Sequence, residues 1–295
     1  TFRRGNVVGA LQVGMNVGDG GLDTRSALQA AADGKIECLV LVGADPLADF
    51  PDTDLARRAL AGARRIIAVD MFLTPSAQLA DVVLAASAYA EKSGTTTNIE
   101  GRVTTVAQQV SPAGNTRPDW MIATELALDL GVDLGYDKIG DVTNDIAWHV
   151  PAYEGITSAA LAAASDGILT GTPTGIAPVT LIEGTVADRN SYDFRLVVSR
   201  TLYDEATGTA HSPSLAQLAG PSAVHLHPLD LGKVGTIEGA AVKVISSRAT
   251  IVLHVVADPT VLRGTAWVPF RHSGANVGDL IDCTAAVNDV RIENL

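Results

Sequence analysis

Cysteine is nearly absent from the chain: Cys38 and Cys283 are the two in 295 residues, and they stand far apart. An iron–sulfur cluster usually takes four cysteine thiolates, and a cysteine zinc site takes a closely spaced set. Residues 1–295 therefore cannot hold an iron–sulfur cluster with their own thiolates, and we predict no metal site in them. We expect both thiols to be reduced and buried.

Positive charge and aromatic side chains are also scarce. Lys and Arg number 21 against 33 Asp and Glu, which gives a net charge of −12, and aromatic residues make up 4%. The negative net charge argues against electrostatic binding to nucleic acid or to an anionic membrane. The low aromatic content leaves few side chains on which bases could stack. No apolar run approaches the roughly 18 residues of a membrane-spanning helix. We predict no nucleic-acid partner and no direct insertion into a membrane.

The phosphate-binding motifs of nucleotide enzymes are missing. Gly18-Asp19-Gly20 begins like a dinucleotide-binding fingerprint, but Asp23 stands where its third glycine belongs. There is no G-x-x-x-x-G-K-[ST] loop and no G-x-S-x-G nucleophile elbow, and we predict no catalytic residue. His225 and His227 are two apart on an expected strand, so both would face one side. They form either a metal pair or, as we prefer without a third nearby ligand, a hydrogen-bonded strand face.

Alternating apolar runs and amphipathic segments dominate the first part of the chain. Strands are expected over 36–42, 65–70 and 82–84, with helices over 54–63 and 75–80 between them. This β-α-β-α-β order predicts an α/β domain with a doubly wound parallel sheet. Glycine-rich residues 1–22 are expected to form a loop with at most a short strand. Further helices are expected over 24–32, 118–130, 144–149 and 157–164.

The last third of the chain changes character. Short β-rich runs separated by turn signals predict a small β-barrel domain, and they lie at 194–199, 223–227, 241–246, 251–257 and 265–270. Between the two parts the sequence is rich in Ala, Gly, Thr and Pro. We therefore predict an α/β domain over 1–164, a linker over 165–190 and a barrel domain over 191–295.

Two acidic residues follow expected parallel strands. Ligands of open parallel sheets lie beyond the carboxyl ends of the strands, where Asp45 and Asp70 stand. These carboxylates would either accept hydrogen bonds from a nucleoside or, as we prefer, simply cap turns and helix starts. The polar segment Gly94 to Gly101, with Asn98 in it, would either wrap closely around a ligand or form a long structural loop.

Several spaced motifs resemble the molybdopterin oxidoreductase superfamily. They are Gly43-Ala44-Asp45-Pro46, Ala80-Asp81-Val82-Val83-Leu84, Glu91-Lys92-Ser93-Gly94-Thr95 with Asn98 and Glu100-Gly101-Arg102, Pro112-x-Gly114 and Pro118-x-Trp120. The later segment from Ser199 to Phe270, with His211-Ser212, resembles the superfamily's pterin-dinucleotide-binding barrel. The resemblance covers nearly the whole chain and implies the same α/β-plus-barrel fold.

Within the superfamily, residues 43–51 and 95–102 are most similar to the large iron–sulfur subunit of bacterial NADH–quinone oxidoreductase, which is respiratory complex I. That resemblance implies a C-terminal, non-catalytic structural part of the peripheral arm, which passes electrons from NADH to quinone. The iron–sulfur clusters would lie outside this segment, in an N-terminal part of the full subunit. Other subunits of the arm would be its partners, on the cytoplasmic face of the bacterial inner membrane.

The alternative implied by the superfamily is the pterin-dinucleotide-binding half of a molybdenum-dependent oxidoreductase, such as a formate dehydrogenase or nitrate reductase. The residues that would then hold the cofactor are Asp45, Asp70, Gly94, Asn98, Arg200 and His211. In cofactor-binding relatives His-Ser-Gly-Thr is typical, whereas Pro213 here offers no backbone N–H to a phosphate. We therefore expect no cofactor in this segment and a vestigial crevice narrowed by side chains, with Arg200 paired to Asp45 or Asp70.

Overall fold

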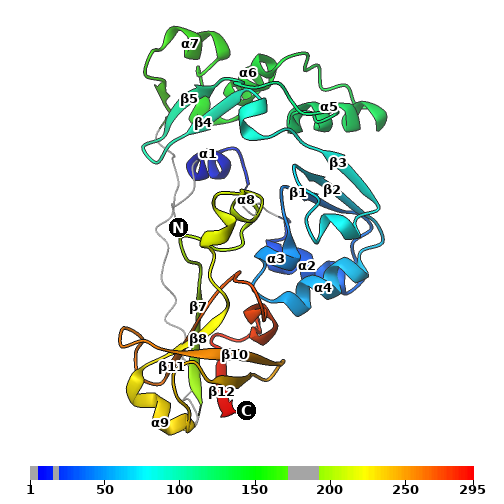
Figure 1. Cartoon of the computed structure of the whole chain (residues 1–295). Coiled ribbons are helices and arrows are strands. Elements are labelled where there is room, and N and C mark those ends of the chain that lie inside the picture. Colours follow the sequence, from blue (N-terminus) through cyan, green and yellow to red (C-terminus); the bar gives the residue numbers. More distant parts are fainter. Residues whose placement is uncertain (1–5, 16–19, 172–192) are drawn as a thin grey trace.

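The computed structural model describes residues 6–15, 20–171 and 193–295. Figure 1 shows a parallel sheet with its helices on the right, a second group of strands and helices at the top, and a β-barrel at the bottom. The α/β-plus-barrel fold class predicted from the sequence is confirmed. Among the described helices, none is long and apolar enough to cross a bilayer.

The parallel sheet has the strand order β1-β2-β3. Its elements are β1 (Leu39–Val42), α3 (Pro46–Asp49), α4 (Thr53–Gly62), β2 (Ile66–Asp70), a 3₁₀ helix (Ala77–Leu79) and β3 (Val82–Ala85). Each of the three strands lies within or overlaps an apolar segment predicted to be a strand from the sequence. Helix α4 begins where the Asp52 carboxylate accepts a hydrogen bond from the Leu55 backbone N–H at 2.9 Å. It buries Leu60 against one face of the sheet.

Helix α2 (Thr24–Ala32) packs along α4, on the side away from the sheet. Asp23 caps it by accepting a hydrogen bond from the Ser26 backbone N–H at 2.7 Å. Gly62 makes the close approach possible, because a Cβ there would lie 2.3 Å from the carbonyl oxygen of Ala31. Helix α4 therefore lies on one face of the parallel sheet, and α2 packs on the outer side of α4.

The second group of elements surrounds a small antiparallel sheet with the order β4-β5-β6. Its elements are α1 (Val7–Gln12), β4 (Gly94–Thr97), β5 (Arg102–Val106), α5 (Asp119–Asp129), α6 (Ile139–His149), α7 (Ser158–Ala163) and β6 (Ile168–Leu169), with 3₁₀ turns at Tyr89–Glu91 and Pro151–Tyr153. Residues 1–22 were expected to form a loop, and this expectation is wrong for Val7–Gln12, which form α1. The domain boundary expected at 164 precedes β6, which pairs with β5. Residues 172–190 of the expected linker lie outside the described residues.

The barrel closes in the order β10-β8-β11-β7-β12-β9. Its elements are β7 (Phe194–Ser199), α8 (Thr207–Ala210), β8 (Ala223–Leu226), α9 (Leu231–Val234), β9 (Ala241–Ile245), β10 (Thr250–Ala257), β11 (Thr265–Pro269) and β12 (Asp289–Asn294), with 3₁₀ turns at Ala216–Leu218, Pro228–Asp230 and Val277–Leu280. Inward-facing Val, Leu, Ile and Phe side chains fill it. The sequence analysis missed β12, in which buried Val290 and Ile292 alternate with charged residues.

Ion pairs join the barrel to the parallel-sheet unit. Arg248, in the turn between β9 and β10, lies 2.9 Å from Asp282, 3.3 Å from Asp54 and 3.7 Å from Asp52. Arg57 on α4 lies 2.7 Å from Asp279 on the barrel side. These contacts hold the carboxyl ends of β1 and β2 close to the loops that follow β7 and β11.

The two cysteines are unpaired in the structure. Cys38 is exposed, so the expectation that both thiols are buried is wrong for it. It precedes β1, whose pairing with β2 begins at Leu39, so Cys38 is not part of the sheet. Cys283 is half-buried beside Asp52, and burial together with that carboxylate raises the pKa of its thiol.

Candidate functional site

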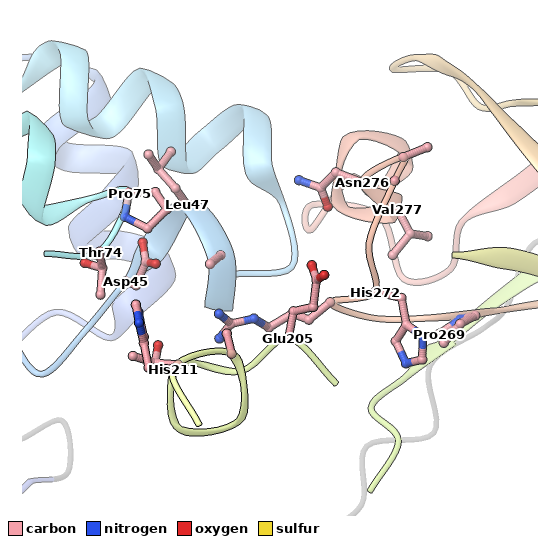
Figure 2. Close-up of a pocket in the computed structure, with 16 residues that line it drawn as sticks. Asp45, Leu47, Thr74, Pro75, Glu205, His211, Pro269, His272, Asn276 and Val277 are labelled. Atoms are coloured by element: carbon pink, nitrogen blue, oxygen red, sulfur yellow. The ribbon is translucent and has the colours of Figure 1, made fainter. Parts of the chain in front are cut away.

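A cavity of about 380 Å³ lies between the parallel-sheet unit and the barrel. Figure 2 shows its walls: Asp45 and Thr74 come from the loops after β1 and β2, while His211 and His272 come from the loops after β7 and β11. The carboxyl end of a parallel sheet is where such folds place their ligands. This cavity is therefore the candidate functional site.

Asp45 provides a buried carboxylate in the wall of the cavity. The residue is 3% exposed. Its Oδ1 accepts hydrogen bonds from the backbone N–H and the hydroxyl of Ser76, at 3.1 and 2.5 Å. Its Oδ2 is buried and has no hydrogen-bond partner among the described residues. A buried acceptor without a partner is energetically costly, so Oδ2 is an unsatisfied acceptor in the wall of the cavity.

His272 provides a second unpaired acceptor. Its Nε2 lies 2.9 Å from the hydroxyl of Thr201, which donates its own hydrogen to the carbonyl of Tyr203 at 2.8 Å. The Thr201 oxygen therefore accepts from an Nε2–H, and in the neutral ring that carries this proton Nδ1 has a free lone pair. That Nδ1 is buried and has no partner within the described part of the chain. The cavity thus offers two acceptors for donor groups, as on a heterocyclic base.

His211 closes part of the cavity wall. Its ring stacks on Phe72, with centroids 4.2 Å apart and an angle of 4° between the planes. Phe72 follows β2, so the stack joins the barrel unit to the parallel-sheet unit. The cavity beside this contact is open.

Arg200 does not pair with Asp45 or Asp70, and that expectation is wrong. Its guanidinium binds Asp204 through Nε at 2.6 Å and Nη2 at 3.0 Å. The turn after β7 brings these two residues together, and Asp204 is buried there. Burial alone raises the pKa of Asp204, but hydrogen bonds from Arg200 and the Ala206 backbone, with the Arg200 charge, lower it overall. Arg200 is therefore committed to a protein carboxylate.

Three other expected site residues do not line the cavity. Asp70 accepts a hydrogen bond from the Phe72 backbone N–H at 3.2 Å and thereby caps the turn after β2. Gly94 begins β4. Asn98 closes the β4–β5 hairpin by accepting from the N–H groups of Glu100 and Arg102, each at 2.9 Å. The segment Gly94 to Gly101 is therefore a hairpin, and of the six expected residues Asp45 and His211 meet at the cavity.

The sequence analysis missed the residues that the loop after β11 and the turn after β7 bring to the cavity. Arg271 has a positive φ of 58° and binds Asp49 at 2.5 Å. Glu205 lies beside it, with its backbone N–H donating to the Arg271 carbonyl at 2.7 Å, and also lines the cavity. Two carboxylates, Asp45 and Glu205, thus line the same cavity as a guanidinium that already has a carboxylate partner. The dipeptide Arg271-His272 after a strand does not by itself predict a site. These residues reach the cavity because the barrel docks on the parallel-sheet unit.

His225 and His227 each have a partner within the protein. His225 on β8 contacts Asp258 at 3.3 Å, and burial lowers the pKa of its imidazole more than Asp258 raises it. His227 lies past the end of β8, where its Nδ1 accepts from the Leu229 backbone N–H at 3.1 Å. Across the residues the structure describes, no three metal-binding side chains gather at one point.

Comparisons with known proteins agree with this architecture. Residues 3–128 match the family described as molybdopterin oxidoreductase, and residues 194–291 match the molydopterin dinucleotide binding domain. The solved structure of acetylene hydratase from Pelobacter acetylenicus superposes with a TM-score of 0.68 at 15% identity, covering 92% of this chain and 46% of that one. This structural likeness shows a shared fold.

Curated relatives carry several different names. The chain is 30% identical to the NADPH-Fe(3+) oxidoreductase subunit alpha of Geobacter sulfurreducens, over 92% of this chain. It is 31% identical to the F420-dependent formate dehydrogenase subunit alpha of Methanocaldococcus jannaschii, over 82%, and 29% identical to an NADH-quinone oxidoreductase subunit (G 2) of Rhizobium meliloti, over 88%. The chain spans 32%, 39% and 30% of the lengths of these relatives. Through its two matching domains and its fold, the chain belongs to the molybdopterin oxidoreductase family.

Proposed function

We propose that the chain is a non-catalytic structural part of the electron-transferring peripheral arm of an NADH–quinone oxidoreductase. In this proposal, iron–sulfur clusters outside residues 1–295 carry the electrons from NADH to quinone. The observation that carries the proposal is the bidentate pair between Arg200 and Asp204. Because Asp204 occupies the Arg200 guanidinium, that group is not available to bind a phosphate of a dinucleotide.

We propose further that the residues at and near the cavity do not hold a whole pterin dinucleotide. A diphosphate needs cations and backbone N–H donors. Arg200 and Arg271 are both held by carboxylates, Pro213 has no N–H, and Asp45 and Glu205 add negative charge to the wall. We therefore derive no reaction step through such a cofactor in this chain.

The similarity to the NADH-quinone oxidoreductase protein of Rhizobium meliloti supports the same proposal. Under it, the partners are other subunits of the arm, and the complex lies peripherally on the cytoplasmic face of the bacterial inner membrane. The closed barrel and its ion pairs with the parallel-sheet unit would make residues 1–295 a rigid cover over the cluster-bearing part.

A second function is favoured by one specific observation. Asp45 Oδ2 and His272 Nδ1 are both buried and unpaired in the described structure, and both residues line the cavity. Two such acceptors suit the N–H groups of a purine base. This would make the chain the pterin-dinucleotide-binding part of a molybdenum-dependent oxidoreductase such as a formate dehydrogenase. The Methanocaldococcus jannaschii relative is named as a formate dehydrogenase subunit.

Calorimetric titration of the full-length protein with guanosine diphosphate separates these two functions. The structural proposal predicts no saturable heat below about 1 mM nucleotide, a free energy weaker than about −4 kcal/mol. The result that would contradict it is micromolar binding that Asp45→Asn abolishes. Asp70→Asn is the matched control, because Asp70 caps a turn and does not line the cavity.

A further inference from the structure

Large apolar side chains stand exposed where α5 ends and the chain turns towards α6. They are 59%, 83%, 53% and 40% exposed at Leu128, Leu130, Val132 and Leu134. Figure 1 shows α5 and the link that follows it at the upper right of the molecule, away from the barrel. Apolar residues scattered singly over a surface are ordinary, whereas a contiguous group of them marks an interaction site. We refer to these four residues as the apolar ridge.

Hydrogen bonds fix the backbone of the apolar ridge. Helix α5 ends in a Schellman motif, in which the Gly131 N–H donates to the Leu128 carbonyl at 2.9 Å. The Val132 N–H donates to the Ala127 carbonyl at 2.8 Å, and Gly131 supplies the positive φ of 85° that the motif requires. Asp133 then fixes the next turn by accepting a backbone N–H at 2.8 Å. The apolar side chains are therefore presented without the ordering cost that a mobile loop meets on binding.

Carboxylates alternate with the apolar ridge. Residues 128–138 contain three Asp and one Lys, so this segment has a net charge of −2. Asp129 and Asp133 stand between the apolar residues, and neither forms an ion pair with the described residues. Arg117, the cation bound to α5 one turn earlier, is already held by Glu125. A surface complementary to the ridge is therefore apolar at its centre and positively charged at its edge.

We propose that the apolar ridge is the docking surface for another protein subunit, whose contact surface offers an apolar pocket bordered by Lys or Arg. Charge selects this occupant. A second copy of this chain, at a net charge of −12, would bring mostly like charge to Asp129 and Asp133, and so would a nucleic acid or an anionic membrane. The inference deepens the proposed function and rests on it for the class of partner, a neighbouring subunit of the same arm.

Photo-cross-linking in the assembled complex identifies the occupant. A photoreactive residue is placed at position 130 of the full-length subunit and, in a separate control variant, at position 262, because Leu262 is 78% exposed on the barrel. The proposal expects position 130 to cross-link to another subunit, at a peptide with apolar residues beside Lys or Arg. The absence of this cross-link, or a cross-link to the same polypeptide or to a second copy, would overturn the proposal. Equal capture of the same peptide from position 262 would overturn it too.

The affinity of the full-length subunit for the cross-linked partner then tests both parts of the docking surface. Leu130→Asp should weaken binding at least about tenfold, because it removes an apolar anchor. Asp133→Asn keeps an acceptor for the turn and should weaken binding about threefold at low salt, with a smaller salt dependence. Leu262→Asp is the matched control and should bind within about twofold of the parent. Unchanged affinity in either ridge variant would overturn the proposal.

The docking surface and the proposed function can fail separately. Metal and pterin analysis of the same preparation tests the structural role, whereas the cross-link and the two affinities test the ridge. A molybdenum-containing complex in which position 130 still cross-links to a basic, apolar surface of another subunit would overturn the proposed function and support the docking surface.

Discussion

Arg248→Met is expected to lower the free energy of unfolding by about 2 kcal/mol at neutral pH. The guanidinium lies between three carboxylates, those of Asp52, Asp54 and Asp282, at the junction of the barrel and the parallel-sheet unit. Without it, the three negative charges repel one another, and the buried Asp52 has lost a counter-charge. Urea unfolding of the two proteins measures the difference.

The loss should depend on pH. Hydrogen bonding from Arg248 is the largest cause that holds the pKa of Asp282 far below its usual value. The stabilisation is therefore complete above the unfolded-state pKa of about 3.9 and is lost as the pH falls through the folded-state value. Arg248→Met should cost progressively less below about pH 4. Arg291→Met, which removes one exposed pair with Glu293, is the control and should change stability by less than about 0.5 kcal/mol. Equal losses in both variants, or a loss independent of pH, would contradict this account.

Gly278→Ala is expected to destabilise the protein by about 1–3 kcal/mol through overpacking between the two units. A Cβ at this position would lie 2.2 Å from the Thr53 hydroxyl and 2.9 Å from the Pro51 carbonyl oxygen. Thr53 begins α4 and Gly278 belongs to the barrel side, so relief of the clash separates them. Urea unfolding measures the loss.

Gly232→Ala provides the control for this prediction. Gly232 lies in α9, and a Cβ there would meet nothing within 4 Å. Alanine also has the better helix propensity, so this variant should be as stable as the parent or slightly more stable. If Gly278→Ala were equally harmless, the close packing of the barrel on α4 would be refuted.

The sequence predicted the elements whose apolar pattern is independent of their neighbours. The runs that form β1, β2 and β7 are apolar and bounded by turn residues, so their pattern was sufficient to predict these strands. The missed β12 presents two buried residues between charged ones, which is too short a pattern to read alone. Helix α1 stands in a glycine-rich stretch and packs on β4, a tertiary contact that local propensity does not contain.

The residue pattern located the candidate site at Asp45, and the family resemblance located it at His211. Asp45 comes just after β1, and the carboxyl end of a parallel strand is a position that sequence can locate. His272 and Arg271 reach the cavity because the barrel docks on the α/β unit, which no local pattern encodes. Arg200 was expected at the crevice by resemblance, but it does not line the cavity, and its partner is the carboxylate four residues later.

The metal and pterin content of the full-length protein is the most direct test of the proposed structural role. Elemental analysis and pterin assay of the purified protein should find iron and acid-labile sulfide, from clusters outside residues 1–295, and neither molybdenum, tungsten nor pterin. Stoichiometric molybdenum or tungsten together with a pterin dinucleotide would contradict the account and would favour the cofactor-binding function of the same fold.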